Sequence, residues 1–196
     1  YYIDLHTGGT ELSVFPLAGY VLHADSSVLE TQRRMAQAFN LPIVWGTSPE
    51  HEGRSLSVAR DAGVPAIYCE YLGSATCSAD GVSAYVDGCF NVMRELGMID
   101  RPPSASRIEQ VVEDRRPASG HLQVCHPSPV DGFFEPAVEL GGFIDQGAAL
   151  GTVCDAQGVR YDIGAEESGR VIVLRTFPRV RAGESVGVVL DLHPAE

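Results

Sequence analysis

The fold is decided at the start of the chain, where residues 1–9 read YYIDLHTGG. An apolar, β-favouring run leads into the triplet Asp4-Leu5-His6 and then breaks at a glycine-rich turn. This order predicts a strand over residues 1–6 with an imidazole at its carboxyl end, where open α/β sheets carry their chemistry. Asp4 stands two residues before His6, so both side chains are expected on the same face of the strand.

Helices and strands are expected to alternate after this strand. A capping-box pattern, Ser27-Val28-Leu29-Glu30, predicts a helix that ends near Phe39. Further strands are expected over residues 41–45 and 64–70, with a helix over residues 55–62 between them. The alternation predicts a mostly parallel or mixed sheet with flanking helices.

A third helix is expected from the cap Ser78 to Leu96, where Gly97 ends it. Its apolar side chains recur at steps of three or four residues, so they are expected to form its buried face. These side chains are Val82, Tyr85, Val86, Phe90, Met93 and Leu96.

The composition changes after residue 99, which predicts three parts. Residues 1–99 form the α/β part, and residues 100–119, rich in Pro, Arg, Ser and Glu, are expected to be a linker. Residues 120–196 contain short apolar runs separated by Gly and Pro, which predict a small all-β barrel or sandwich domain. Its strands are expected over residues 122–125, 132–134, 148–153, 169–173 and 186–190.

Charge and cysteine content limit the class of protein. The 196 residues carry a net charge of −12, which argues against nucleic acid or an anionic membrane as the main partner. The five cysteines are scattered and odd in number, which favours reduced thiols and a cytoplasmic location. No apolar run approaches the length of a transmembrane helix.

His6 and Glu70 are the candidate catalytic pair. Both are expected to end apolar strands of one parallel sheet, whose carboxyl ends meet at the same edge. Imidazole is a natural zinc ligand, and a nearby carboxylate can take a proton from water at the metal. The alternative is structural: a hydrogen-bonded histidine at a strand end and a solvated acid.

Other basic residues have weaker claims to a role. Arg54 and Arg60 precede Glu70, and either guanidinium would pair well with a substrate carboxylate, although both also suit a solvated surface. His51 is expected at the surface or along the site, and His23 at the surface. The β-rich part contains three histidines, and their spacing does not suggest a metal site: His121, His126 and His193.

Four stretches, taken in order, carry a family resemblance. Residues 2–9 contain His6, residues 62–73 (AGVPAIYCEYLG) contain Glu70, residues 88–98 (GCFNVMRELGM) follow, and residues 136–151 lie in the β-rich part. This ordered set resembles the succinylglutamate desuccinylase/aspartoacylase family, a branch of the zinc carboxypeptidase clan. The resemblance covers nearly the whole chain and implies a partial zinc-carboxypeptidase-like α/β domain followed by a small β-domain.

The resemblance assigns roles to two residues: it implies that His6 is one of three zinc ligands and Glu70 the general base. Asp4 is expected to orient the imidazole because it lies on the same face of the strand as His6. The family's other two ligands belong to a His-x-x-Glu motif that precedes the Asp-Leu-His triplet, and no such motif precedes it here. Catalytic zinc sites use about three protein ligands. We therefore expect one zinc ion, Zn²⁺, whose other ligands lie upstream of residue 1.

The function implied by the resemblance is that of a zinc-dependent amidohydrolase. It would remove an acyl group from an N-acylated amino acid, a small-molecule substrate. Two alternatives stay open: a non-catalytic remnant that acts as a binding or oligomerisation module, and a metallocarboxypeptidase of the same clan. Assembly into a homo-oligomer also stays open.

Overall fold

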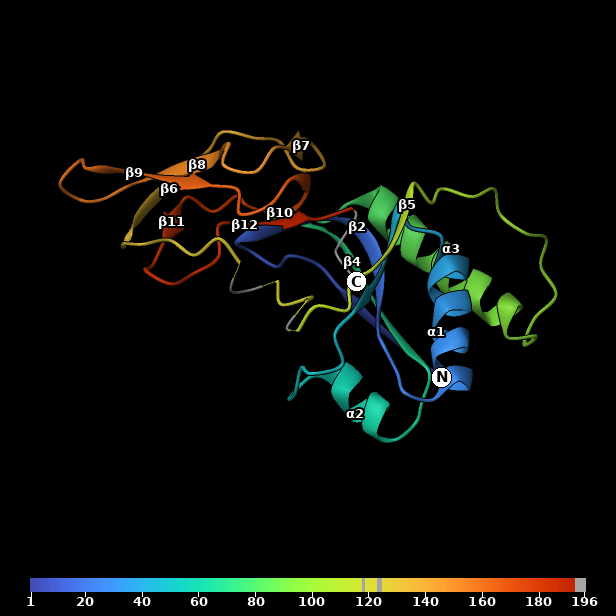
Figure 1. The fold of residues 1–196 in the computed structure, drawn as a ribbon. Coiled ribbons are helices and arrows are strands. Elements are labelled where there is room, and N and C mark those ends of the chain that lie inside the picture. The colour runs from blue at the N-terminus through green and yellow to red at the C-terminus, as the bar shows by residue number, and fades with distance from the viewer. Residues whose placement is uncertain (118, 123–124, 193–196) are drawn as a thin grey trace.

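A mixed β-sheet runs through the computed structural model, which describes residues 1–117, 119–122 and 125–192 (Figure 1). Along its main path the strand order is β1 (Tyr2–His6), β4 (Ala66–Gly73), β2 (Leu12–Val21), β10 (Gly169–Arg175) and β12 (Gly187–Leu190). In addition, β3 (Ile43–Thr47) pairs with β2, β5 (Gln110–Glu113) with β3, and β7 (Phe143–Ile144) with β10. Pairs β1–β4, β2–β3 and β3–β5 are parallel, whereas β2–β4, β2–β10 and β10–β12 are antiparallel, so the predicted mixed sheet is confirmed.

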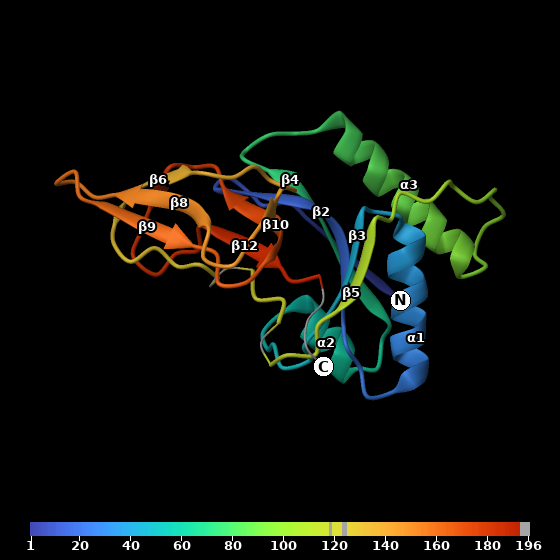
Figure 2. The same cartoon turned by 45° about the horizontal axis from the view of Figure 1, so that its top comes forward.

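Helices cover both faces of this sheet (Figure 2). Helices α1 (Ser26–Phe39) and α3 (Ala79–Glu95) pack on one face, and the short α2 (Ser55–Asp61) packs on the other. Neighbouring residues of a strand point to opposite faces. Tyr20 of β2 therefore enters the core under α1 and α3, whereas Val21 packs against the cluster that contains Leu56 and Ala59 of α2.

Helix α1 begins earlier than the capping-box pattern predicts. Its N-cap is Asp25, whose carboxylate accepts hydrogen bonds from the main-chain nitrogens of Ser27 and Val28, at 2.8 and 3.4 Å. An aspartate at the N-cap satisfies free N–H groups of the first turn, so Ser27 lies inside the helix. The predicted cap is therefore wrong by two residues, while the predicted helix is present.

Helix α3 buries only part of the predicted face: Tyr85 and Leu96 pack against the core, but three other members are exposed. Val82, Val86 and Phe90 are among the exposed large apolar side chains, at 54, 51 and 44%. The buried face instead contains Gly81, Ala84, Gly88, Asn91 and Val92. A Cβ at Gly88 would lie 2.6 Å from the Phe39 ring, so α3 approaches α1 through its smallest residues. Apolar spacing pointed to the large side chains, but close helix packing selected the small ones.

Three strands of this sheet are absent from the sequence predictions. No strand is predicted over β2 or β7, and β5 lies inside the predicted linker over residues 100–119. β2 tolerates Pro16, which has no N–H for a ladder, because Pro16 lies where the β2–β4 register shifts between Val14 and Leu17. The segment over residues 110–113 is a strand because it pairs in parallel with β3.

The β-rich part contributes a second sheet. Its strands are β11 (Arg179–Val180), β6 (Gly132–Pro136), β8 (Ala149–Cys154) and β9 (Arg160–Gly164), in that order. The strands predicted over residues 169–173 and 186–190 are present as β10 and β12, but they extend the main sheet. That sheet therefore continues across the predicted boundary at residue 120. The strand predicted over residues 122–125 includes residues outside the described part of the chain.

Among the described residues, no helix has the length and apolar character needed to cross a membrane.

Candidate active site

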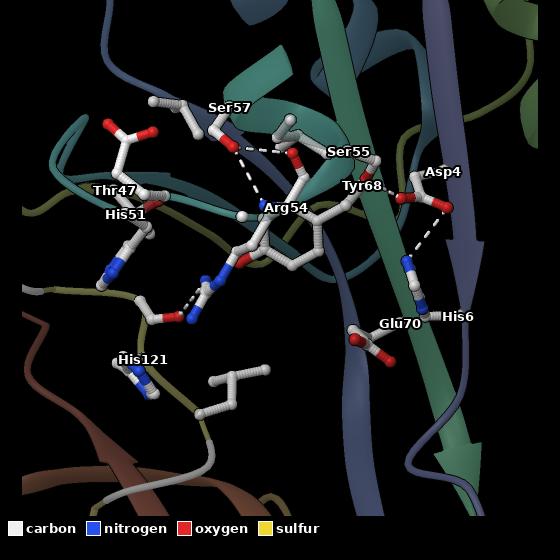
Figure 3. Close-up of a pocket in the computed structure, with 16 residues that line it drawn as sticks. Asp4, His6, Thr47, His51, Arg54, Ser55, Ser57, Tyr68, Glu70 and His121 are labelled. Atoms are coloured by element: carbon white, nitrogen blue, oxygen red, sulfur yellow. Dashed lines mark hydrogen bonds and ion pairs between the residues drawn. The ribbon is translucent and has the colours of Figure 1, made fainter. Parts of the chain in front are cut away.

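The register of two parallel strands brings His6 and Glu70 together. β1 and β4 run side by side, and His6 is paired with Glu70 across them. His6 is the last residue of β1, as predicted, but β4 continues past Glu70 to Gly73. Glu70 thus lies within its strand, yet its side chain lies beside that of His6 at the cavity (Figure 3).

A tyrosine from α3 fixes this end of the two strands. The Tyr85 hydroxyl lies 2.5 Å from the main-chain oxygen of His6 and 2.9 Å from that of Cys69. One phenol proton is thus shared between the main chains of β1 and β4. Its burial, followed by the charges of Cys69 and Glu70, raises the pKa of Tyr85, so the hydroxyl stays neutral and donates.

Glu70 has the properties of a proton acceptor. Its Oε2 atom is buried and has no hydrogen-bond partner in the described part of the chain. Burial raises the pKa of Glu70 from 4.5 to about 7; His6 opposes this rise and Asp4 adds to it. A carboxylate whose pKa is close to neutrality both accepts and returns a proton efficiently. An unpartnered oxygen leaves room for water or substrate to bind it.

Asp4 orients the His6 imidazole. The Asp4 Oδ1 atom lies 3.0 Å from His6 Nε2, and its Oδ2 atom accepts a hydrogen bond from the Ser55 hydroxyl on α2. Burial opposes ionisation of Asp4, but the hydrogen bonds from Ser55 and His6 outweigh it and lower its pKa. With Nε2 on a carboxylate, Nδ1 is the ring nitrogen that remains for a metal, in the arrangement typical of histidine ligands.

These residues line a cavity of about 510 Å³. Asp4, His6 and Glu70 lie on one side of it, and Arg54, His51 and His121 lie on the other (Figure 3). The remaining lining residues come from the three strands β2, β3 and β4, from the segment around α2, and from the segment that follows β5. They are Val21, Thr47, Glu52, Gly53, Ser55, Leu56, Ser57, Tyr68, Gly120 and Leu122.

The two candidate arginines have different positions. Arg54 is the N-cap of α2 and lines the cavity; Ser57 Oγ accepts from its main-chain nitrogen at 2.9 Å. Arg54 forms no ion pair with any described residue, and its Nη1 donates to Gly120 O at 3.4 Å. Arg60 does not line the cavity, and its guanidinium pairs with Glu52 and Asp61, both at 2.8 Å. Of the two candidate arginines, only Arg54 therefore lies at the cavity.

A pair of histidines on the far side was not predicted. The His51 and His121 rings meet edge to face, with centroids 5.3 Å apart. Burial, followed by the charges of Arg54 and His51, lowers the pKa of His121. His51 was expected to line the site or lie at the surface, whereas no role was expected for His121. No sequence spacing signals their pairing, because it arises from two loops far apart in the chain.

Two further histidines, His23 and His126, have structural contacts. His23 Nδ1 accepts from the main-chain nitrogen of Asp25 at 2.9 Å. His126 is buried and contacts Gly187 O and the main-chain nitrogen of Glu166, at 3.1 and 3.2 Å. His193 lies outside the described residues. It begins a His-x-x-Glu spacing at residues 193–196, but this spacing follows the site strands instead of preceding them.

The described residues hold no group of three or more His, Cys, Asp or Glu side chains arranged to bind a metal. Asp4, His6 and Glu70 lie together, but Asp4 holds the imidazole and Glu70 is the candidate base. The residues therefore fit one ligand position of a zinc site together with its proton acceptor. The other ligand positions would have to be supplied from elsewhere.

Comparisons with known proteins identify a relative of this chain and solved structures with a similar fold. No protein-family model matches the chain. The N-alpha-acetyl-L-2,4-diaminobutyric acid deacetylase of Halomonas elongata is 26% identical over 208 residues, which cover 97% of this chain and 56% of that protein. The chain is thus a homologue of a deacylase and spans a little over half of its length.

Solved structures share the fold. A succinylglutamate desuccinylase/aspartoacylase from Rhodobacter sphaeroides superposes with a TM-score of 0.83 and 21% identity, over 98% of this chain and 58% of that one. The product-bound ectoine utilization protein EutE (DoeB) from Ruegeria pomeroyi gives a TM-score of 0.81 and 22% identity, over 95% and 56%. The predicted fold class and the predicted family resemblance are confirmed.

Proposed function

The chain has the fold of the succinylglutamate desuccinylase/aspartoacylase family, and from this premise we propose that it forms part of a zinc-dependent deacylase site. The reaction is removal of the acyl group from an N-acylated amino acid. The observation that carries the proposal is the β1–β4 register, which places His6 beside Glu70 in a cavity of about 510 Å³. A cavity of this size suits a small-molecule substrate.

Glu70 acts as the general base. Its Oε2 atom takes a proton from the water that attacks the acyl carbonyl and then delivers this proton to the leaving amine nitrogen. The two properties that support this role are the absence of a partner at Oε2 among the described residues and a pKa of about 7. A carboxylate already paired with an arginine would be too weak a base for the task.

His6 supplies one metal ligand, held in orientation by Asp4 at 3.0 Å. A zinc ion at this position would polarise the acyl carbonyl as a Lewis acid. Asp4 keeps the imidazole in the tautomer with its proton on Nε2, so that the Nδ1 lone pair is available. Zinc sites of this kind use about three protein ligands, so the site requires ligands besides those of the described residues.

Arg54 binds the carboxylate of the substrate. Its guanidinium lines the cavity on the side opposite Glu70, which separates the charged end of the substrate from the bond that breaks (Figure 3). A guanidinium matches a carboxylate with two parallel hydrogen bonds. The homologue from Halomonas elongata is named for an N-acetylated amino acid, which has a carboxylate and an acyl amide in one small molecule.

The test uses the protein expressed from its complete coding sequence. Zinc content is measured by elemental analysis, and hydrolysis of N-acetyl-2,4-diaminobutyrate, N-acetylaspartate and N-succinylglutamate is followed by amine release. We expect near-stoichiometric zinc, which His6→Ala removes, and hydrolysis of at least one substrate. Glu70→Gln should retain zinc while turnover falls by about 10²- to 10⁴-fold. Glu50→Gln, at an exposed carboxylate outside the cavity lining, is the matched control.

Other outcomes assign the protein to another class. Absence of zinc in the wild-type protein would contradict the proposal and favour a non-catalytic binding module. Cleavage of peptides but of no N-acyl amino acid would replace the deacylase by a metallocarboxypeptidase. Turnover by Glu70→Gln at the wild-type rate would remove Glu70 from the mechanism.

A further inference from the structure

The side of the cavity opposite Glu70 is built from basic side chains. Arg54 comes from the start of α2, His51 from the loop before it, and His121 from the segment that follows β5 (Figure 3). The imidazole rings of His51 and His121 lie edge to face at 5.3 Å. The charges of Arg54 and His51 both act on His121, which places the three groups in one electrostatic cluster.

This basic cluster has no acidic partner among the described residues. Arg54 forms no ion pair, and its guanidinium is oriented by Gly120 O at 3.4 Å. Glu52 also lines the cavity, but its side chain is 73% exposed and its carboxylate pairs with Arg60. A basic cluster without a counter-charge, in a chain of net charge −12, produces a local field that favours an anion.

The segment that carries His121 is fixed to the α/β part. Ser119 Oγ accepts from the main-chain nitrogen of Ser48 at 2.8 Å and donates to Asp114 O at 2.7 Å. His51 Nε2 lies 2.6 Å from Ser119 O, and because a carbonyl oxygen only accepts, Nε2 carries the proton. His51 therefore holds the segment that positions His121 in the cavity wall.

His121 itself has unused hydrogen-bonding capacity. Its Nδ1 atom is buried and has no hydrogen-bond partner among the described residues. Buried polar atoms in proteins normally have a partner, so an unpartnered ring nitrogen in a cavity wall is suited to a ligand. One guanidinium and one imidazole N–H supply three donors and a single fixed charge, which suits a carboxylate better than a phosphate dianion.

We propose that Arg54 and His121 together bind the carboxylate of the substrate's amino-acid half, and that His51 is the residue that positions His121. The identity of the substrate rests on the proposed function, but binding of the carboxylate does not require turnover. The assignment adds a specificity-determining residue, His121, to the arginine, and it comes from a different part of the chain.

The experiment compares N-acetylglycine with its carboxamide, N-acetylglycinamide, by calorimetric titration of the intact protein. We expect the carboxylate to bind at least about 10-fold more tightly than the amide. His121→Phe keeps a ring of similar size without nitrogens, and it should weaken binding of N-acetylglycine about 10-fold and leave the amide unaffected. His121→Gln restores an N–H donor and should recover part of the loss. His23→Gln, outside the cavity lining, is the control.

A second readout separates contact from support. Binding of N-acetylglycine should raise the pKa of His121 in NMR titrations, and the amide should not. His51→Phe should also shift the amide resonances of Ser119 and Gly120, as a positioning role requires. Equal affinities for carboxylate and amide, or unchanged binding in His121→Phe, would overturn the proposal. Selective carboxylate binding without hydrolysis of any N-acyl amino acid would contradict only the proposed function.

Discussion

The two sides of the cavity are assembled in different ways. On one side, Asp4, His6 and Glu70 belong to neighbouring strands, and their relative positions follow from the register of a parallel ladder. On the other side, His51 and His121 come from two loops joined by side-chain to main-chain hydrogen bonds. A ladder fixes its side chains through every backbone pair, whereas a loop depends on a few contacts. We therefore expect the stability of the strand side to depend mainly on the ionisation of its buried carboxylate. The stability of the loop side should depend on individual hydrogen bonds and packing contacts.

The largest expected effect is on the strand side and concerns stability. The raised pKa of Glu70 means that the folded chain holds its proton more tightly than the unfolded chain does. Stability is then fully present below pH 4.5 and falls as pH rises through about 7, by on the order of 3 kcal/mol. In chelator-treated protein at pH 8, the Glu70→Gln variant should unfold at a higher urea concentration than wild type. At pH 4.5 the two unfolding midpoints should differ little.

Glu50→Gln serves as the control, because this exposed carboxylate should show no such pH-dependent difference. If Glu70→Gln and wild type differ by the same amount at both pH values, the Glu70 carboxylate is ionised without penalty. The strand side would then be no more sensitive to charge than the protein surface.

The next effect tests the orientation of the imidazole. Asp4→Asn weakens the contact that holds His6 Nε2 at 3.0 Å. In the intact protein, zinc affinity measured by chelator competition should fall about 10- to 100-fold, as is usual when the partner of a ligand histidine is removed. Asp145→Asn, at an exposed position outside the cavity lining, should bind zinc as wild type does. Unchanged affinity in Asp4→Asn would leave Asp4 without a positioning role.

The third effect is on the loop side and concerns a glycine. Gly120 has a φ of +86°, and a Cβ there would lie 2.7 Å from Thr47 Cγ2. Gly120→Ala should therefore lower the free energy of unfolding by about 2 kcal/mol, measured by urea titration. Gly158→Ala is the matched control, because Gly158 has a φ of +84° and no atoms within 4 Å of the added Cβ. Equal losses in both variants would show that packing against Thr47 contributes nothing.

The smallest effect is the loss of one loop contact. Ser119→Ala removes the hydroxyl that joins Ser48 to Asp114 and should cost about 1 kcal/mol. Hydrogen exchange should accelerate at the Ser48 amide and stay unchanged along β4. A change in the Glu70 titration midpoint in this variant would show that the two sides of the cavity are coupled.

The same contrast explains what the sequence could predict. The apolar run before His6 and the apolar run before Glu70 both predict strands, and parallel strands bring their carboxyl ends to one edge. That reasoning placed the two side chains together without knowledge of β2, which lies next to β4 in the sheet. His121 could not be found in this way, because its neighbours are set by loop contacts that leave no periodic signal.

The wrong predictions also have physical causes. In α3, large apolar residues such as Val82 and Phe90 recur at helical spacing, but the helix packs through Gly88 against Phe39. Hydrophobic periodicity records which residues are apolar and does not record how closely two helices approach. In β5, a short run of four residues lies in a polar context, and only its pairing with β3 makes it a strand.

The pairing of β10 with β2 joins the β-rich part to the α/β part through a backbone ladder, as between Val173 and Val14. A cut at the predicted boundary at residue 120 would break that ladder and expose an open strand edge on each piece. Open edges recruit other strands, so the two pieces would aggregate sooner than fold independently. We therefore expect the β-rich part to unfold in one cooperative transition with the strands that carry His6 and Glu70, at the same temperature and denaturant concentration.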